Sequence, residues 1–221
     1  MKVGAILHHI GRENPQRFLE KLAFALKQGL DVVIGSDYTL DFELTRPNTT
    51  SEKENIYKEI ENLSRVSSTL VLPGTISYPL SDTEMVHVAP VFCEGSLLAE
   101  LRKKRDNGEG DLAKLAGLNF VRGNGHRKLI EHAGKKFAVE ICGDHGSQNV
   151  RGCDIELILA YDKNAGFHLN SINSNFSRKV VVCDGYEPFA SAFDYNHLRR
   201  EERLRIVSGK VVDRKLKIFE I

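Results

Sequence analysis

The sequence has no strong excess of charge of either sign and no long apolar run. Its formal net charge is +1, so no global field attracts nucleic acid or an anionic membrane surface. No apolar run approaches the roughly 20 residues that a membrane-spanning helix needs. The opening segment MKVGAIL is also too short and wrongly flanked for a signal peptide. We therefore expect a protein that binds neither nucleic acid nor membrane.

The sequence contains few cysteines, and their spacing does not suggest pairs. The four cysteines form no CxxC pair and lack the density of a small disulfide-rich scaffold, which argues against a disulfide framework and against a zinc site. Reduced thiols are typical of the cytoplasm. The sequence thus predicts a cytoplasmic protein without a bound metal.

The organisation predicted for residues 1–221 is a single α/β domain. The chain has 221 residues, 41% of them hydrophobic, which is enough for one sizeable core. No internal repeat, low-complexity tract or linker divides it. Strand-like segments alternate with helical ones, and several strand-like segments are adjacent in the middle of the chain. This order favours a sandwich with mixed sheets over a purely doubly wound sheet.

Local signals place several of these elements. KVGAIL predicts a first strand, and NPQRFLEKLAFALKQGL predicts a helix with Asn14 as N-cap and Pro15 at its first position. SEKENIYKEIENLSRV predicts a second helix, opened by a capping box of Ser51 and Glu54. The tail RIVSGKVVDRKLKIFEI predicts a closing hairpin that turns at Ser208-Gly209 or at Asp213.

Two charged residues follow strand-like segments. Asp37 comes just after the apolar run DVVIGS, and acids beyond apolar strands line the edge of α/β sheets where ligands gather. Alone, such an acid is more often a turn cap. The run RKKR is mostly a solvated face by its composition, but strand alternation from Leu97, Ala99 and Leu101 would turn Lys103 to one common face.

Cys142 is the strongest candidate for chemistry. It ends the apolar run KKFAVEIC and precedes Gly143 and Asp144, which leaves room for a tight elbow that lifts a thiol out of the sheet. A thiolate needs a base or a cation at neutral pH. Asp37 could accept the proton, Lys103 could stabilise the thiolate and an oxyanion, and the Gly143 N–H could be a second oxyanion donor.

These segments, taken in order, resemble the nitrilase or carbon–nitrogen hydrolase superfamily over about residues 1–160. KVGAILHH is similar to the first strand of that family, and FLEKLAFALKQGLDVVIGSDYTL to its helix and the strand that ends in the catalytic acid. TLVLPGTISY and HVAPVFCEGSLLAELRKK are similar to the region that delivers the lysine. GKKFAVEICGDHGSQNVRGCDIELILA is similar to the nucleophile strand, elbow and following strand. The resemblance implies an α-β-β-α sandwich with mixed sheets.

The resemblance also implies a catalytic triad of Asp37, Lys103 and Cys142. By its position Lys103 matches better than Lys104, although a slip of one residue would exchange them. Glu109 stands where the family often has a second acid that positions the lysine. The acid is Asp rather than the usual Glu, and Ser36 replaces the proline that normally precedes it. The chain after residue 160 is also shorter than in the family.

Glu140 departs from the apolar residue that is usual at its place. Strand alternation puts it on the same face as Cys142, so it either adds a carboxylate to the site or binds a cationic part of the substrate. A pairing of Cys142 with His145 or His126 is a further possibility, although a turn residue such as His145 is more often exposed.

The expected function is a cysteine hydrolase that cleaves a non-peptide carbon–nitrogen bond through a thioester, without metal or organic cofactor. The substrate implied by the family is a small amide or nitrile, amides being the commoner, and the implied assembly is a homodimer or higher homo-oligomer. Two alternatives stay open: an isochorismatase-like hydrolase, which also uses Asp, Lys and Cys, and a catalytically degenerate module that binds a small molecule or a partner.

Overall fold

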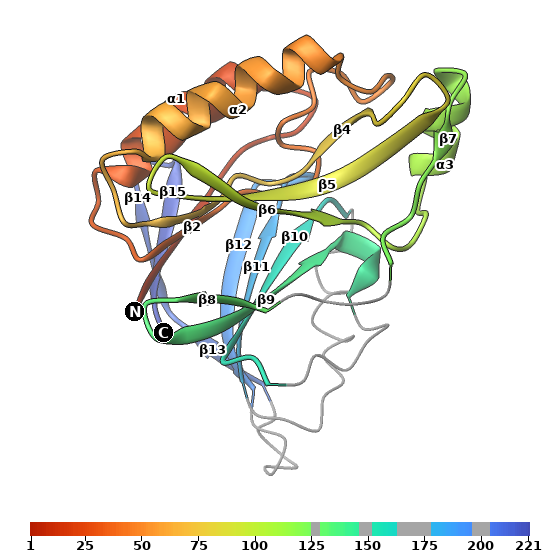
Figure 1. Cartoon of the computed structure of the whole chain (residues 1–221). Coiled ribbons are helices and arrows are strands. Elements are labelled where there is room, and N and C mark those ends of the chain that lie inside the picture. The colour runs from red at the N-terminus through yellow and green to blue at the C-terminus, as the bar shows by residue number, and fades with distance from the viewer. Residues whose placement is uncertain (125–128, 146–151, 163–177, 196–203) are drawn as a thin grey trace.

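A computed structural model describes residues 1–124, 129–145, 152–162, 178–195 and 204–221. Two mixed β-sheets face each other in this structure, and helices cover the outer face of one of them (Figure 1). The predicted α/β sandwich with mixed sheets is thereby confirmed. His126 lies outside the described residues.

The first sheet contains nine described strands, which run in the order β14-β15-β1-β2-β3-β5-β4, with β6 and β7 also paired to β5. Parallel pairing joins β1 to β2, β2 to β3 and β5 to β7. Strand β15 runs antiparallel to β1 and β14, and β5 runs antiparallel to β3, β4 and β6. The bounds are β1 (Lys2–Ile6), β2 (Val32–Ile34), β3 (Leu70–Leu72), β4 (Ile76–Pro79), β5 (Glu84–Cys93), β6 (Ser96–Arg102), β7 (Asn119–Phe120), β14 (Gly209–Val212) and β15 (Leu216–Glu220).

The second sheet has six described strands in the order β13-β12-β11-β10-β9-β8. Strands β9, β10 and β11 are parallel, and the outer strands pair antiparallel. The bounds are β8 (Ile130–His132), β9 (Lys135–Ile141), β10 (Ile155–Ala160), β11 (Arg178–Asp184), β12 (Phe189–Tyr195) and β13 (Leu204–Val207). The closing hairpin of β14 and β15 turns at Asp213, the second of the two predicted turns.

The two long helices begin where local hydrogen bonds satisfy their first N–H groups. Helix α1 (Pro15–Leu26) has Asn14 as N-cap, as predicted. Helix α2 (Thr50–Ser64) is opened by a capping box of Thr49 and Glu52, so the predicted box of Ser51 and Glu54 is wrong. Two such boxes overlap in this sequence, and Arg46 also binds Glu52 in a bidentate pair, which favours the earlier one.

Apolar side chains fill two layers. Inward-facing residues of both sheets form the central core, among them Val32, Leu72, Phe137 and Leu157. A second cluster packs α1 and α2 against the outer face of the first sheet (Figure 1). None of the helices in the described part of the chain is both long and apolar enough to cross a membrane.

The fold brings the ends of strands from both sheets to one edge of the sandwich. Strand β2 leads into Asp37 and strand β9 into Cys142, where the short 3₁₀ helix η1 (Cys142–Asp144) begins. The backbone N–H of Asp37 donates to the carbonyl of Ala160 at the end of β10, over 3.2 Å. This bond joins the two sheets at the edge where the candidate residues lie.

Candidate active site

Asp37 is fully buried and its carboxylate accepts three hydrogen bonds. Thr75 Oγ1 donates to Oδ1 over 2.6 Å, and His87 Nε2 lies 2.7 Å from the same oxygen. Lys103 Nζ donates to Oδ2 over 3.3 Å. Burial would by itself raise the pKa of Asp37, but the charges of Lys103 and His87 outweigh it and hold that pKa well below its usual range. Asp37 is therefore a carboxylate in the resting site.

Lys103 lies between two acids. It follows β6, where its N–H donates to the carbonyl of His87 on β5 over 2.9 Å. Its side chain is 1% exposed, and its ammonium donates to Glu109 Oε1 over 2.5 Å as well as to Asp37. Burial would lower the pKa of Lys103, but the two carboxylates and the nearby Cys142 raise it. The structure brings Asp37, Lys103 and Glu109 into direct contact.

The neighbouring Lys104 has a different position in the structure. Its backbone N–H donates to Asp144 over 3.0 Å, and its side chain is partly exposed, whereas that of Lys103 is buried. The lysine that faces the two acids is thus Lys103.

Cys142 occupies a sharp turn at the end of β9. Its φ angle is 42°, a left-handed conformation that is costly for a residue with a side chain. The thiol donates weakly to the carbonyl of Tyr161 over 3.8 Å. Burial and the charge of Asp37 raise the pKa of Cys142 to about 12, although Lys103 acts in the opposite direction. The resting group is a neutral thiol that interacts electrostatically with both Asp37 and Lys103.

Hydrogen bonds join the segment after β6 to this turn. The carboxylate of Asp144 accepts the backbone N–H groups of Lys104 and Arg105, over 3.0 and 2.8 Å. A Cβ added to Gly143 would lie 1.5 Å from the amide nitrogen of Asn107, so only glycine lets the Asn107 side chain pack on the turn. These contacts hold the lysine segment and the cysteine segment together.

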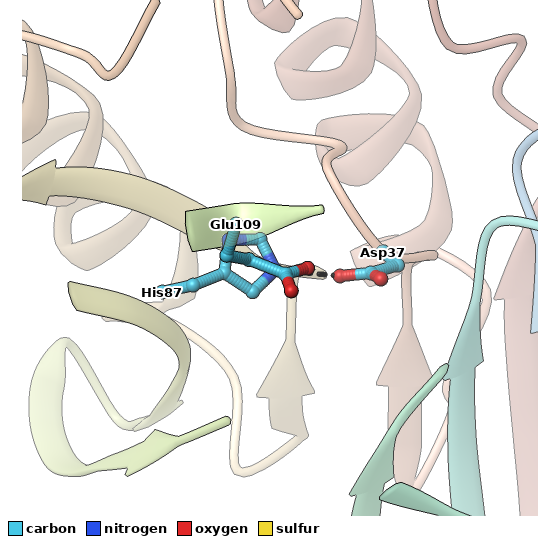
Figure 2. Close-up of side chains that lie close together, drawn as sticks. All are labelled: Asp37, His87 and Glu109. Atoms are coloured by element: carbon cyan, nitrogen blue, oxygen red, sulfur yellow. Dashed lines mark hydrogen bonds and ion pairs between the residues drawn. The ribbon is translucent and has the colours of Figure 1, made fainter. Parts of the chain in front are cut away.

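Two further side chains at the site were missed by the sequence analysis. Tyr38, also in the left-handed region with φ 57°, donates from its hydroxyl to Glu109 Oε1 over 2.5 Å. His87 is fully buried, and Figure 2 shows it pointing with Glu109 toward Asp37. A signal for His87 was present, because it is the lone ionisable residue in the apolar run MVHVAPV.

Glu140 and His145 meet in a second buried cluster. His145 Nδ1 lies 2.9 Å from Glu140 Oε2 and 3.2 Å from Glu156 Oε1, and Arg178 binds Glu156. Val139 and Ile141 face the central core, so Glu140 between them points to the opposite face of its sheet. The expectation of an exposed His145 is wrong, since it is 3% exposed. A role for Glu140 in the chemistry stays a prediction.

Two groups of side chains bring three potential metal ligands together: Asp37, His87 and Glu109, and Glu140, His145 and Glu156. In the first group the Lys103 ammonium donates to both carboxylates and so occupies the place that a cation would take. In the second group Arg178 already binds one of the carboxylates.

Asp41, four residues after Asp37, gives a prediction for stability. Burial raises the pKa of Asp41 to about 7, above the roughly 3.9 of an unfolded aspartate. Its contribution to folding is therefore present at low pH and is lost as the pH rises from about 4 to about 7. Because asparagine cannot ionise, Asp41→Asn should gain roughly 1 kcal/mol in unfolding free energy relative to wild type per pH unit in this window. Urea unfolding across the window measures this.

His8 makes an opposing contribution to the pH dependence of stability, and the difference between Asp41→Asn and the wild type removes it. Burial lowers the pKa of His8 to about 4, so its contribution to folding is lost as the pH falls below about 6.5. Both proteins carry His8, and its effect cancels in the difference. A difference between the two proteins that does not change with pH would contradict the assignment to Asp41.

No protein-family model and no curated protein sequence matches this chain. Solved structures do match it in fold. The NitN amidase from Nesterenkonia sp. AN1 superposes with a TM-score of 0.73 at 12% identity, over 100% of this chain and 92% of that chain. A cysteine-to-alanine variant of the amidase in complex with butyramide gives 0.74 at 12% identity, over 100% and 90%. A cysteine-to-serine variant, described as belonging to the nitrilase superfamily, gives 0.72 at 12% identity, over 100% and 91%.

The two facing mixed sheets define the class of the fold as an α/β sandwich. More particularly, the chain has the fold of the nitrilase-superfamily amidases, along its whole length and with little sequence identity.

Proposed function

We propose that this protein is a cysteine hydrolase that cleaves the carbon–nitrogen bond of a small non-peptide amide. The observation that carries the proposal is the buried ammonium of Lys103, which contacts Asp37 and Glu109 and interacts electrostatically with Cys142. A base, a cation and a thiol are thus gathered at one edge of a fold shared with amidases.

In the first step, Cys142 attacks the amide carbon. Since the raised pKa keeps Cys142 neutral at rest, its proton must leave as the new carbon–sulfur bond forms. Asp37 accepts this proton as general base. The carbonyl oxygen becomes an oxyanion, which Lys103 and the N–H of Gly143 stabilise.

In the second step, the tetrahedral intermediate collapses to a thioester. Asp37 returns the proton to the leaving nitrogen, and ammonia or an amine departs. Asp37 then accepts a proton from water as its oxygen attacks the thioester. When the carbon–sulfur bond breaks, Asp37 passes this proton to the departing sulfur, so that the carboxylic acid, the Cys142 thiol and the Asp37 carboxylate are restored. The cycle consumes one water and requires neither metal nor organic cofactor.

Glu109 would act by positioning Lys103. It also accepts hydrogen bonds from Tyr38 and from the backbone N–H of Asn107, the latter over 2.8 Å. These contacts hold both of its oxygens, so the ammonium has a defined place between the two acids. A positioned cation stabilises a developing negative charge better than a mobile one.

The substrate that we propose is a small aliphatic amide. Structures of the Nesterenkonia amidase include a complex with butyramide and an acrylamide adduct at the active-site cysteine. We further propose, from the family resemblance and the composition, that the protein works as a homo-oligomer in the cytoplasm. The fold speaks against the isochorismatase-like alternative, in which the acid lies on the first strand, because Asp37 follows β2.

The first test is a screen of small amides for ammonia release with the wild type and Asp37→Asn. Asparagine keeps the shape of Asp37 but cannot accept the proton, so turnover should fall by at least about 100-fold. Mass spectrometry of the intact protein during turnover should also detect the thioester, as an added acyl group on either the wild type or the variant.

The control is a thermal melt of both proteins, which shows whether the loss of activity reflects unfolding. A folded wild type that binds small amides and releases no ammonia would contradict the hydrolase proposal. It would instead favour the alternative of a nitrilase-like fold that only binds its ligand.

A further inference from the structure

A continuous chain of buried hydrogen bonds leads away from Asp37. His87 Nε2 lies 2.7 Å from Asp37 Oδ1, and His87 Nδ1 lies 2.7 Å from Ser77 Oγ. Ser77 Oγ in turn lies 3.0 Å from Asp41 Oδ2. Asp37, Ser77 and His87 are fully buried, and Asp41 is 8% exposed. Three hydrogen bonds, called links below, thus connect these four side chains.

The number of hydrogens in these links can be counted. Each link needs one hydrogen between its two heavy atoms. A neutral imidazole brings one and the serine hydroxyl brings one, while two ionised carboxylates bring none. Two hydrogens are too few for three links. In a link without a hydrogen, the lone pairs of two acceptor atoms would repel each other at hydrogen-bond distance, which is unfavourable in a buried site. The observed geometry requires a third hydrogen.

We propose that Asp41, Ser77 and His87 form a proton relay that stores one additional proton and sets the charge beside Asp37. In the first arrangement Asp41 holds the proton and donates to Ser77, Ser77 donates to His87 Nδ1, and neutral His87 donates from Nε2 to Asp37. In this arrangement all three links are filled. Ser77, His87 and Asp41 are then positioning residues; that role in catalysis rests on the proposed hydrolase function, whereas the stored proton does not.

The second arrangement follows from a shift of two protons. The Asp41 proton passes to Ser77 Oγ while the Ser77 proton passes to His87 Nδ1. Asp41 becomes a carboxylate and His87 an imidazolium, so that the total charge is unchanged. An imidazolium beside Asp37 stabilises its carboxylate and weakens it as a base, whereas neutral His87 leaves it more basic. The position of one proton thus controls the base strength of Asp37.

The surroundings of the relay support an exchangeable proton at Asp41. Its Oδ1 accepts the N–H of Ser77 over 2.7 Å and the amide of Asn48 over 3.3 Å, which leaves Oδ2 for the relay. Asp41 also lines a surface pocket of about 440 Å³. The raised pKa of Asp41, about 7, agrees with a carboxyl that keeps a proton. Among the described residues, other charged or titratable groups that interact with the chain of hydrogen bonds are Tyr38, Lys103, Glu109, Cys142 and Asp184.

The test uses NMR on ligand-free protein with 15N-labelled histidine and 13C-labelled aspartate, and compares the wild type with Asp41→Asn. In the wild type the His87 Nδ1 signal should shift together with the Asp41 carboxyl signal as the pH passes about 7. In Asp41→Asn the amide can only donate to Ser77, because its oxygen keeps the two N–H donors. Ser77 then donates to His87 Nδ1, so the proton of His87 should stay on Nε2.

Asp184→Asn is the matched control. Asp184 is another buried acid with a raised pKa, about 6, and the hydrogen bonds described for its side chain come from backbone N–H groups. Its charge also interacts with that of Asp37, but none of these hydrogen bonds joins the relay, so this variant should leave the position of the His87 proton, and its dependence on Asp41, as in the wild type. His87→Gln assigns the signal among the eight histidines.

The proposal is overturned if His87 titrates alike in the wild type and in Asp41→Asn, or if neutral His87 carries its proton on Nδ1 in Asp41→Asn. Because these spectra need no substrate, a protein without turnover would contradict the hydrolase proposal and leave the relay intact. For an active enzyme, a pH–rate profile that is unchanged by Asp41→Asn would contradict control of Asp37 by the relay.

Discussion

Cys142→Ala is expected to reduce amide hydrolysis to the background rate, a loss of at least about 1000-fold. No other described thiol is placed near both Asp37 and Lys103, since Cys93 lies on β5, Cys183 is buried in the central core, and Cys153 interacts with Glu156 and Arg178. Substrate binding should change little, because the nucleophile adds little to ground-state affinity. Ammonia release and calorimetric titration of a small amide measure the two effects.

Cys93→Ala is the matched control for this experiment. Cys93 is a partly buried free thiol of the first sheet, and its removal should leave turnover within a few-fold of the wild type. If Cys142→Ala keeps its activity while thiol reagents still inactivate it, another cysteine carries the reaction and the assignment of Cys142 is wrong.

Lys103→Met is expected to cause the largest combined loss of stability and activity. Methionine leaves Asp37 and Glu109 as two buried acids without their shared cation. Removal of one partner of a buried ion pair costs roughly 3–5 kcal/mol, and the loss of an oxyanion donor costs about 100- to 1000-fold in turnover. Urea unfolding and ammonia release test the two parts separately.

The companion variants separate charge from shape. Adding Glu109→Gln to Lys103→Met removes one of the two stranded carboxylates and should restore part of the stability, but not the activity. Lys104→Met changes the adjacent, partly exposed lysine, whose backbone N–H donates to Asp144, and should have a much smaller effect on both. If Lys104→Met lowered stability and turnover more than Lys103→Met did, Lys104 would be the residue that supplies the cation.

The amidases that share this fold do so at 12% identity, so what the comparison shows in common is the fold. An aspartate in this arrangement is shorter than the glutamate implied by the family resemblance. The backbone bond from Asp37 to Ala160 at the end of β10 shows how the acid is held close to the second sheet. Because β10 pairs with β9, this contact keeps the shorter acid near the strand that ends at Cys142.

The sequence by itself determined the sandwich and the placement of its strand ends. The alternation of apolar residues, the cap at Asn14 and the glycine after Cys142 are local signals, and they act over a few residues. Asp37 and Cys142 could be singled out because each directly follows an apolar strand. Lys103 could be singled out because strand periodicity selects one lysine of a basic run.

Only the tertiary structure decided which side chains meet. His87, Ser77 and Asp41 are 10 to 50 residues away from their partners in the relay, and no local pattern specifies such pairings. The sequence pattern could not show that His145 turns inward to Glu140, because burial there depends on β10, which supplies Glu156. The observed capping box begins at Thr49 instead of the predicted Ser51, because Arg46, outside the helix, binds Glu52. For the relay and for His145, hydrogen bonds between distant segments made these choices, since buried polar groups must find partners wherever the fold brings them.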